Sequence, residues 1–409
     1  MIAMLQQFFL CKQFRFSMLM AEDKLPPKIA KYENLEIDDN ILHQLQKLFI
    51  FLSLSDRQDF TPTEFCFAFK DFQGNPVNVR IQQDAQEFIG MIFDRLERAL
   101  KATPFRSILE SIYGGKSISQ ITCTNCHNIK ENEDIFYNLS LSVKNSKTLY
   151  ESLEKYIIKD TISEYMCEKC KKKVDISKRA LLSYLPNILI VHLQRIIFNI
   201  ESLMNEKINS RLEFPHVLNL EPYTKEGVQS RETPDKKDDP SKSSLHPKDY
   251  YEYTLKGIVV HIGSADAGHY YSYINVKEGK WLEFNDSTIR DFDPKNIENE
   301  CFGGVTSGDS ADFWSIGPNR ESTKSAYILI YERKFKDPLT FIFQNPQEKE
   351  DFFKAHNFPL SEISDIIEKD RIISKLPFDS LPSTMPKLLS QVFSFSIFSS
   401  PFFLDGLEG

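Results

Sequence analysis

Two pairs of cysteines are the residues whose types and spacing most directly indicate chemistry in this sequence. Cys123 and Cys126 form one Cys-x-x-Cys pair, and Cys167 and Cys170 form a second. Such a pair places two thiolates on one side of a tetrahedral ion, and two pairs complete a closed site. We therefore expect one structural zinc with no open position for metal chemistry. The alternative is four unrelated reduced cysteines.

A histidine forms the second candidate site. His269 follows a loop of small residues, Gly263–Gly268, and begins an apolar run, while Asn285 and Asp286 end a later run. A catalytic histidine needs a partner on its far ring nitrogen to fix its tautomer, and an Asn or Asp at a neighbouring strand end can provide it. The spacing leaves two interpretations open, a general base and a structural histidine.

The elements that must position these residues change character along the chain. Helical periodicity dominates first, over Met1–Phe9, over Ile41–Leu52 and after Asp84, where Asp84–Glu87 has the form of a capping box. Beyond Gly114 the period changes to that of strands, and helices followed by strands indicate an α+β fold with an antiparallel sheet. The expected strands are Ile135–Val143, Ile188–Leu193, Leu255–Ile262, Tyr270–Val276, Trp281–Phe284 and Tyr327–Tyr331.

Composition excludes several classes of protein. Hydrophobic residues make up 41% and charged residues 26% of the 409 residues, which is typical of a folded domain. The net charge of −8 disfavours a nucleic-acid partner, and no apolar run is long enough to span a membrane. The odd count of seven cysteines, four of them paired, is typical of a reducing compartment, so we expect a cytoplasmic or nuclear protein.

Two segments lack the composition of a packed core. Residues from about 224 to 249 are rich in Lys, Asp, Ser and Pro, and we expect them to form a flexible insertion. Residues 334–409 are irregular and Phe-rich, and we treat them as a separate tail with no assigned role.

Several motifs, in order along the chain, resemble the catalytic domain of the ubiquitin-specific proteases. These are papain-like cysteine peptidases that remove ubiquitin, and the similarity is greatest to their fat-facets-type members. The resemblance covers about residues 1–333. The motifs are Gln82–Phe88, the two cysteine pairs, Leu185–Arg195, Gly268–Tyr273, Trp281–Ser287, Glu300–Gly304 and Ser325–Tyr331.

The resemblance implies a papain-like α+β fold with a thumb at about 1–115, and zinc-ribbon fingers and a palm at about 116–333. It implies that His269 is the general base, that Asn285 orients it and that Asp286 is an additional aid. Ubiquitin and ubiquitinated proteins would be the partners, with no nucleic acid and no membrane.

The resemblance also implies a set of ubiquitin-binding residues. Gln83, Asp84 and Glu87 would lie near the arginine-bearing tail of ubiquitin, with Gly268 in a mobile loop over that tail. An alternative role for Asp84 and Glu87 is to cap their helix, and the two roles are compatible.

The sequence departs from the family at the nucleophile. The family's cysteine belongs to an Asn-x-Gly-Asn-Thr-Cys-Tyr-Met-Asn-Ser box, and Met1–Gln7 matches only the end of that box. The catalytic cysteine would precede Met1, so we expect the chain as printed not to cleave. Cys11 is not expected to substitute for this nucleophile. It would lie about 18 Å along the first helix from the expected position of the catalytic cysteine, and away from the N-terminus of that helix. Two functions stay open: a deubiquitinase whose printed sequence starts too late, and a ubiquitin-binding pseudoprotease.

Overall fold

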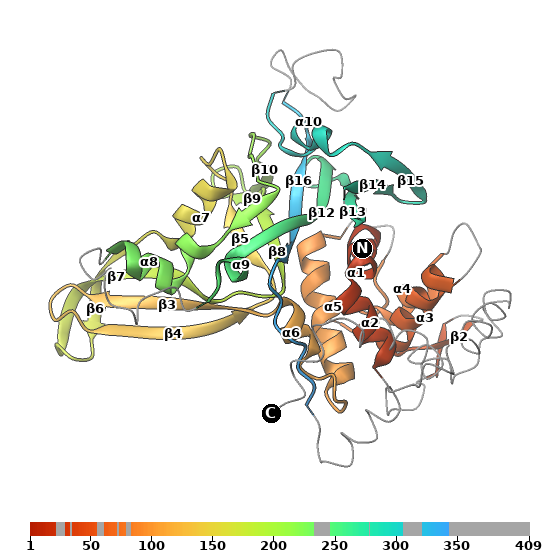
Figure 1. Ribbon diagram of the computed structural model, residues 1–409, viewed down its shortest axis with the longest axis horizontal. Helices are drawn as coiled ribbons and strands as arrows, with labels where there is room; N and C mark the ends of the chain where they lie inside the picture. Colours follow the sequence, from red (N-terminus) through yellow and green to blue (C-terminus); the bar gives the residue numbers. More distant parts are fainter. Residues whose placement is uncertain are drawn as a thin grey trace. The chain divides into compact units, whose positions relative to one another are not determined.

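The computed structural model describes residues 1–21, 29–32, 35–54, 61–71, 73–78, 83–232, 246–277, 279–305 and 321–342. The chain divides into two compact units (Figure 1). Among the described residues, the first consists mainly of those within Ala3–Ile112 together with 338–342, and the second mainly of those within Tyr113–Asp337. Among the helices in these described ranges, none combines the length and the apolar character that crossing a membrane requires.

Helices make up most of the first unit, as their periodicity predicts. Aromatic side chains form part of its core, where the ring centroid of Phe8 lies 5.1 Å from that of Phe14 and 5.4 Å from that of Phe93. The elements are α1 (Ile2–Leu10), α2 (Lys12–Met20), the strand pair β1 (Ile29–Tyr32) and β2 (Leu35–Asp38), α3 (Ile41–Leu54), α4 (Thr63–Ala68), α5 (Ala85–Leu100) and α6 (Ile108–Tyr113).

The position of Cys11 differs in part from the expectation. Cys11 has an extended backbone (φ −72°, ψ 100°), ends α1 and is the N-cap residue of α2. It therefore lies away from the N-terminus of the first helix, as expected, but it also lies at the start of a second helix, which the sequence did not predict. The break has a packing reason: on one straight helix Phe8 and Phe14 would point to different sides, whereas the break lets both rings enter the same core.

The second unit contains two main sheets. The first is an antiparallel four-stranded sheet in the order β4-β3-β7-β6. Its strands are β3 (Gly115–Cys123), β4 (Ile129–Phe136), β6 (Asp160–Cys167) and β7 (Lys172–Tyr184). These are the strands that carry the cysteine pairs, and Figure 1 shows them running alongside one another.

The second sheet has eight strands in the order β15-β14-β13-β12-β16-β8-β5, with β11 paired to β12. All of its pairings are antiparallel except that of β5 with β8. Its strands are β5 (Leu139–Ser142), β8 (Ile188–Gln194), β11 (Val217–Asn219), β12 (Glu252–Gly263), β13 (Gly268–Lys277), β14 (Lys280–Asn285), β15 (Thr288–Phe292) and β16 (Lys324–Arg333).

Shorter elements complete the second unit. They are α7 (Leu149–Ile157), the strand pair β9 (Ile196–Asn199) and β10 (Met204–Lys207), η1 (Glu221–Tyr223), α8 (Lys225–Glu232), α9 (Lys248–Tyr251), η4 (Pro294–Asn296) and α10 (Ile297–Cys301). The resulting mixture of helices and sheets confirms the predicted α+β class.

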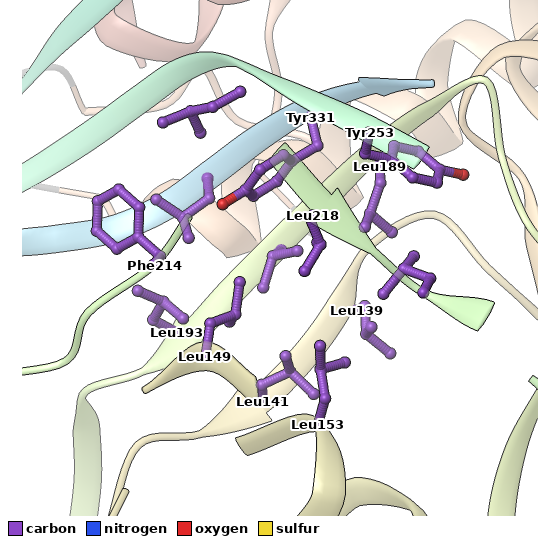
Figure 2. Close-up of a cluster of buried hydrophobic side chains, with 14 of the residues drawn as sticks. Leu139, Leu141, Leu149, Leu153, Leu189, Leu193, Phe214, Leu218, Tyr253 and Tyr331 are labelled. Carbon is purple, nitrogen blue, oxygen red and sulfur yellow. The ribbon is translucent and has the colours of Figure 1, made fainter. Parts of the chain in front are cut away.

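One face of the large sheet packs into the core of the second unit. Leucines of β5, β8 and α7 meet aromatic side chains of β12 and β16 in this cluster (Figure 2). Tyr253 and Tyr331 are fully buried within it, and their hydroxyls donate to the carbonyls of Pro186 and Pro215. Satisfying these hydroxyls allows the rings to contribute their full apolar area to the core.

Two predicted segments have a different structure from the one expected. The single run Ile135–Val143 is split, because β4 ends at Phe136 in one sheet and β5 begins at Leu139 in the other. The insertion expected at 224–249 is helical at both ends, in α8 and α9, and 233–245 lies outside the described residues. An ion pair supplements the buried Val228 in holding α8, since the two terminal nitrogens of the Arg179 guanidinium donate to the carboxylate of Glu232, at 2.7 and 3.1 Å.

The start of the expected tail is tied to the rest of the chain. Arg333 donates to the carboxylate of Asp337 at 2.5 Å in the second unit. Further on, Thr340 donates its N–H to the Ser111 hydroxyl, and the ring of Phe341 meets Phe105 edge-on in the first unit. Residues 343–409 lie outside the described part of the chain.

Candidate active site and metal centre

Two tight turns at the tip of the four-stranded sheet bring the cysteines together. Cys123 ends β3 and Cys167 ends β6, and each begins a turn whose later residue, His127 or Lys171, has a left-handed backbone. In each turn that later residue donates its N–H back to the carbonyl of the first cysteine, at 3.0 and 2.9 Å. Each turn reverses the direction of the backbone, so that the second cysteine of the pair faces the first.

The sulfurs of the four cysteines have the spacing of a tetrahedral metal site. All four lie within 4.8 Å of one another, with Cys123 Sγ 3.7 Å from Cys170 Sγ and Cys126 Sγ 3.8 Å from Cys167 Sγ. A tetrahedron with Zn–S bonds of about 2.3 Å has sulfur–sulfur edges of about 3.8 Å. The predicted cluster is therefore confirmed as a group that could hold a metal ion.

Backbone amides in the two turns donate to the first cysteine of each pair. The N–H groups of Cys126 and Cys170 donate to Cys123 Sγ and Cys167 Sγ, at 3.5 and 3.4 Å. The hydrogen bond that the Cys126 amide donates lowers the pKa of the Cys123 thiol. Thiolates are the form that binds zinc, and four of them would leave no position for a substrate. The residues present fit the zinc ribbon expected of the fingers.

The hairpin of β12 and β13 positions His269. Ile262 lies opposite His269 in the register, and Gly263 lies opposite Gly268 at the end of the pair. β14 pairs with the other side of β13 and ends at Asn285. His269 Nε2 lies 2.7 Å from Asn285 Oδ1, so the two residues that the sequence placed at neighbouring strand ends meet in a hydrogen bond.

This hydrogen bond sets the chemistry that the imidazole can perform. Because the Asn285 amide oxygen accepts, the proton of the neutral ring lies on Nε2, and Nδ1 keeps its lone pair. The side chain of His269 is 41% exposed, so a substrate or another side chain can approach the imidazole ring. A ring held in this tautomer can take a proton from a thiol.

Asp286 stands beside this pair at a greater distance. Its carboxylate oxygen lies 3.8 Å from His269 Nε2, and its side chain is 64% exposed. The residue has a left-handed backbone (φ 51°) in the turn between β14 and β15, which Asp tolerates better than most residues. At 3.8 Å this oxygen is farther from His269 Nε2 than a direct hydrogen bond allows.

Glycine is required where the loop before His269 enters β13. A Cβ atom at Gly268 would lie 2.3 Å from the carbonyl oxygen of Ile262 and 2.4 Å from His261 Nε2. Gly263, at the other end of the loop, has φ +118°. The Ser264 amide donates to the Ala267 carbonyl at 2.8 Å and closes the loop.

The Gln83–Glu87 region belongs to the first unit. Asp84 is the N-cap of α5, and its carboxylate accepts from the N–H groups of Gln86 and Glu87, at 2.8 and 3.1 Å. The capping role expected of Asp84 is confirmed. Gln83 and Asp84 are half-buried and Glu87 is exposed, and their contact with ubiquitin remains a prediction.

The other cysteine of the second unit is unsuited to act as a nucleophile. Cys301 is fully buried in α10, and this burial raises the pKa of its thiol well above the usual value. Among the described residues, no hydrogen bond joins His269 to a cysteine sulfur.

Lys207 is a residue of this region that sequence reasoning missed. It ends β10, yet its ammonium donates to two backbone carbonyls of β12, one of the two strands of the His269 hairpin. Burial, and then the nearby Arg195, lower the pKa of Lys207 to about 7. A lysine at the end of a short hairpin gives no signal of such burial in the sequence.

Comparison with known proteins gives a consistent result. Residues 1–331 match the family described as "Ubiquitin carboxyl-terminal hydrolase". The chain is 33% identical to human ubiquitin carboxyl-terminal hydrolase 34, over 74% of this chain and 9% of that protein. It is 35% identical to mouse ubiquitin carboxyl-terminal hydrolase 9X, over 76% of this chain and 13% of that protein. It is 30% identical to the Drosophila melanogaster ubiquitin carboxyl-terminal hydrolase puf, over 83% of this chain and 9% of that protein. The chain thus spans only a small part of the length of these relatives.

Proposed function

This chain belongs to the ubiquitin carboxyl-terminal hydrolase family, as a ubiquitin-specific protease, and from that membership we propose that the whole protein hydrolyses the bond at the carboxyl terminus of ubiquitin. The observation that carries the proposal is the 2.7 Å hydrogen bond between His269 Nε2 and Asn285 Oδ1. It leaves Nδ1 as a base in the orientation that cysteine peptidases of the papain type need. The substrates are ubiquitin and ubiquitinated proteins.

In the proposed reaction His269 acts as a general base and then as a general acid, once while the thioester forms and once while it is hydrolysed. Nδ1 takes the thiol proton, and the thiolate attacks the carbonyl carbon at the ubiquitin carboxyl terminus to form a tetrahedral intermediate. The imidazolium then returns the proton to the leaving amine as the carbon–nitrogen bond breaks, which leaves a thioester. Water, deprotonated by the same nitrogen, hydrolyses the thioester and restores the thiol.

Asn285 and Asp286 act on His269 and make no contact with the reacting atoms. Asn285 holds the ring through Nε2 while Nδ1 gains and loses its proton. Asp286, 3.8 Å away, adds a negative charge that favours the imidazolium. A neutral amide supports the imidazolium less than a carboxylate would, so the two residues share this task.

We propose that the nucleophile is none of the seven cysteines in the printed chain. Four of them fit a structural zinc site, Cys301 is fully buried, and burial raises the pKa of the Cys66 thiol. The seventh, Cys11, ends α1, whereas the cysteine of the family's box would precede that helix. The support for this proposal is that Met1–Gln7 resembles only the end of the family's cysteine box. We therefore expect the 409 residues alone to bind ubiquitin, in the cytoplasm or nucleus, without cleaving it.

The experiment that tests the proposal restores the missing box. The chain extended upstream with that box should hydrolyse a fluorogenic amide at the ubiquitin carboxyl terminus, whereas the printed chain should not. His269→Ala should abolish the activity, and Asn285→Ala should reduce it by a smaller factor because the base itself remains. Cys11→Ala is the matched control and should leave the rate unchanged.

The opposite outcomes identify the alternative function. An extended protein that is folded and binds ubiquitin but stays inert would reject the hydrolase, and so would one whose rate does not depend on His269. Either result would favour the ubiquitin-binding pseudoprotease. Turnover by the printed chain that is lost in Cys11→Ala would identify Cys11 as the nucleophile.

A further inference from the structure

The ammonium of Lys207 lies at an unusual place for the end of a surface hairpin. The tip of the β9–β10 pair is exposed, with Ile200 and Leu203 at 80% and 71%. Lys207, at the other end of β10, is half-buried. Its Nζ donates to the carbonyl of His261 at 3.0 Å, to that of Gly263 at 3.2 Å, and to that of Thr323.

These three carbonyls lie next to Ile262, the residue that pairs with His269 across the hairpin. His261 and Gly263 flank Ile262 in β12, and Ile262 lies opposite His269 in β13 and opposite Lys324 in β16. Thr323 directly precedes β16, and its carbonyl also accepts the N–H of Gly263 at 3.3 Å. One ammonium therefore links the end of β12 to the start of β16, next to the residue that pairs with His269.

The hydrogen-bonding capacity of a lysine matches this arrangement. An ammonium has three donors and no acceptor, and here three carbonyl oxygens receive them. None of these partners is a carboxylate, and the charged group acting on Lys207 is another cation, the fully buried Arg195. Arg195 is itself held by carbonyls, those of Ala326 and Ile208 among them, at 2.8 and 2.9 Å.

Placing a cation here has a cost that the fold alone does not require. Partly burying an ammonium beside a guanidinium, with no counter-charge among its hydrogen-bond partners, is unfavourable. An apolar side chain of the same length would cover the same surface without that cost. Such an apolar side chain could not donate hydrogen bonds, so it could not hold the three carbonyls at the end of β12 and before β16 in place.

We propose that Lys207 is a positioning residue, whose ammonium fixes the start of the Gly263–Gly268 loop and through it the place of His269. The link to catalysis rests on the proposed hydrolase function. The link to the loop does not, because it follows from the hydrogen bonds of Lys207. Lys207 touches neither the reacting atoms nor the imidazole.

Hydrogen exchange tests the loop by itself. In Lys207→Met the amides of Gly263, Ser264 and Ala267 should exchange about tenfold faster or more, since hydrogen bonds from a charged donor are lost. Lys207→Arg, which restores donors, should recover part of the protection. The matched control is Lys256→Met, because Lys256 lies on β12, the strand that contains His261 and Gly263, and pairs with Glu332 at 3.4 Å, away from the loop. This control should leave exchange in the loop unchanged.

The pattern of exchange separates positioning from general stability. Faster exchange confined to the loop supports the proposal, whereas equal acceleration in the four-stranded sheet would mean that Lys207 only stabilises the unit and would overturn it. Unchanged exchange in Lys207→Met would also overturn it. If Lys207→Met does not fold, Lys207→Gln, which keeps a shorter donor, should give an intermediate loop exchange in a folded protein, and wild-type exchange there would reject the proposal.

Kinetics of the chain extended with the missing box test the catalytic link. Lys207→Met should lower kcat by about tenfold or more with a smaller change in KM, because a misplaced base affects the chemical step more than binding. An unchanged kcat together with a loosened loop would reject the link to His269. An extended wild-type protein that is inert would reject the hydrolase function, and the exchange result would still decide the role of Lys207 in the loop.

Discussion

Replacing one cysteine of the four-sulfur cluster should remove the metal from the protein. We choose Cys167→Ser because Cys167 is buried, receives the N–H of Cys170 and lies 3.8 Å from Cys126 Sγ, so it is integral to the cluster. A serine hydroxyl is shorter, and it is not deprotonated at neutral pH. Three thiolates would then face an open position, and the closed tetrahedral site would be lost.

The expected loss of stability follows from mass action. A metal held at a concentration a thousandfold above its dissociation constant stabilises the folded state by about 4 kcal/mol. For a unit of roughly 200 residues, 1 kcal/mol corresponds to about 2–4 °C in melting temperature. Cys167→Ser should therefore melt about 8–16 °C lower than the metal-loaded protein. The loss should concentrate in the four-stranded sheet, whose two turns the metal joins.

Elemental analysis and thermal unfolding measure these two effects. Protein purified without added metal should contain about one zinc per chain, Cys167→Ser should contain almost none, and a chelator should lower the melting temperature of the wild type to that of the variant. Cys66→Ser is the matched control, because Cys66 is a half-buried cysteine outside the cluster. Well-folded wild-type protein without zinc would refute the reasoning, as would a chelator that leaves the melting temperature unchanged.

Two further predictions concern the loop and the insertion. Gly268→Ala should lower the activity of the extended protein about a hundredfold with a smaller loss of stability. The reason is that the new Cβ would lie 2.3 Å from the Ile262 carbonyl oxygen and would displace His269, the next residue. Kinetics equal to those of the wild type would contradict this prediction. The hydrogen bonds from Arg179 lower the pKa of Glu232 below its usual value of 4.5, so their stabilising contribution is present above that pH and is lost as the pH falls through the lowered value. Acid unfolding should show this loss in the wild type and less of it in Glu232→Gln, and identical acid profiles would contradict the assignment.

Local patterns in the sequence determined much of this protein. The helices after Met1, Ile41 and Asp84 follow from a periodicity that each segment carries within itself. The cysteine pairs likewise fix their own turns, so the cluster could be predicted from spacing. His269 and Asn285 could be paired in advance only because a small-residue loop and two strand ends marked their places, and the resemblance to a family gave the pair its role.

Tertiary structure decided what those local patterns leave undetermined. The alternation over Ile135–Val143 reads as one strand, yet its two ends belong to different sheets, and only the parallel pairing of β5 with β8 assigns the second end. Cys11 caps a helix because aromatic rings on both sides of it enter one core. Lys207 gives no signal in its own hairpin, since its three partners come from strands much later in the chain. The physical reason is common to all three: backbone periodicity is a property of a few consecutive residues, whereas burial and strand pairing depend on segments that meet only when the chain folds.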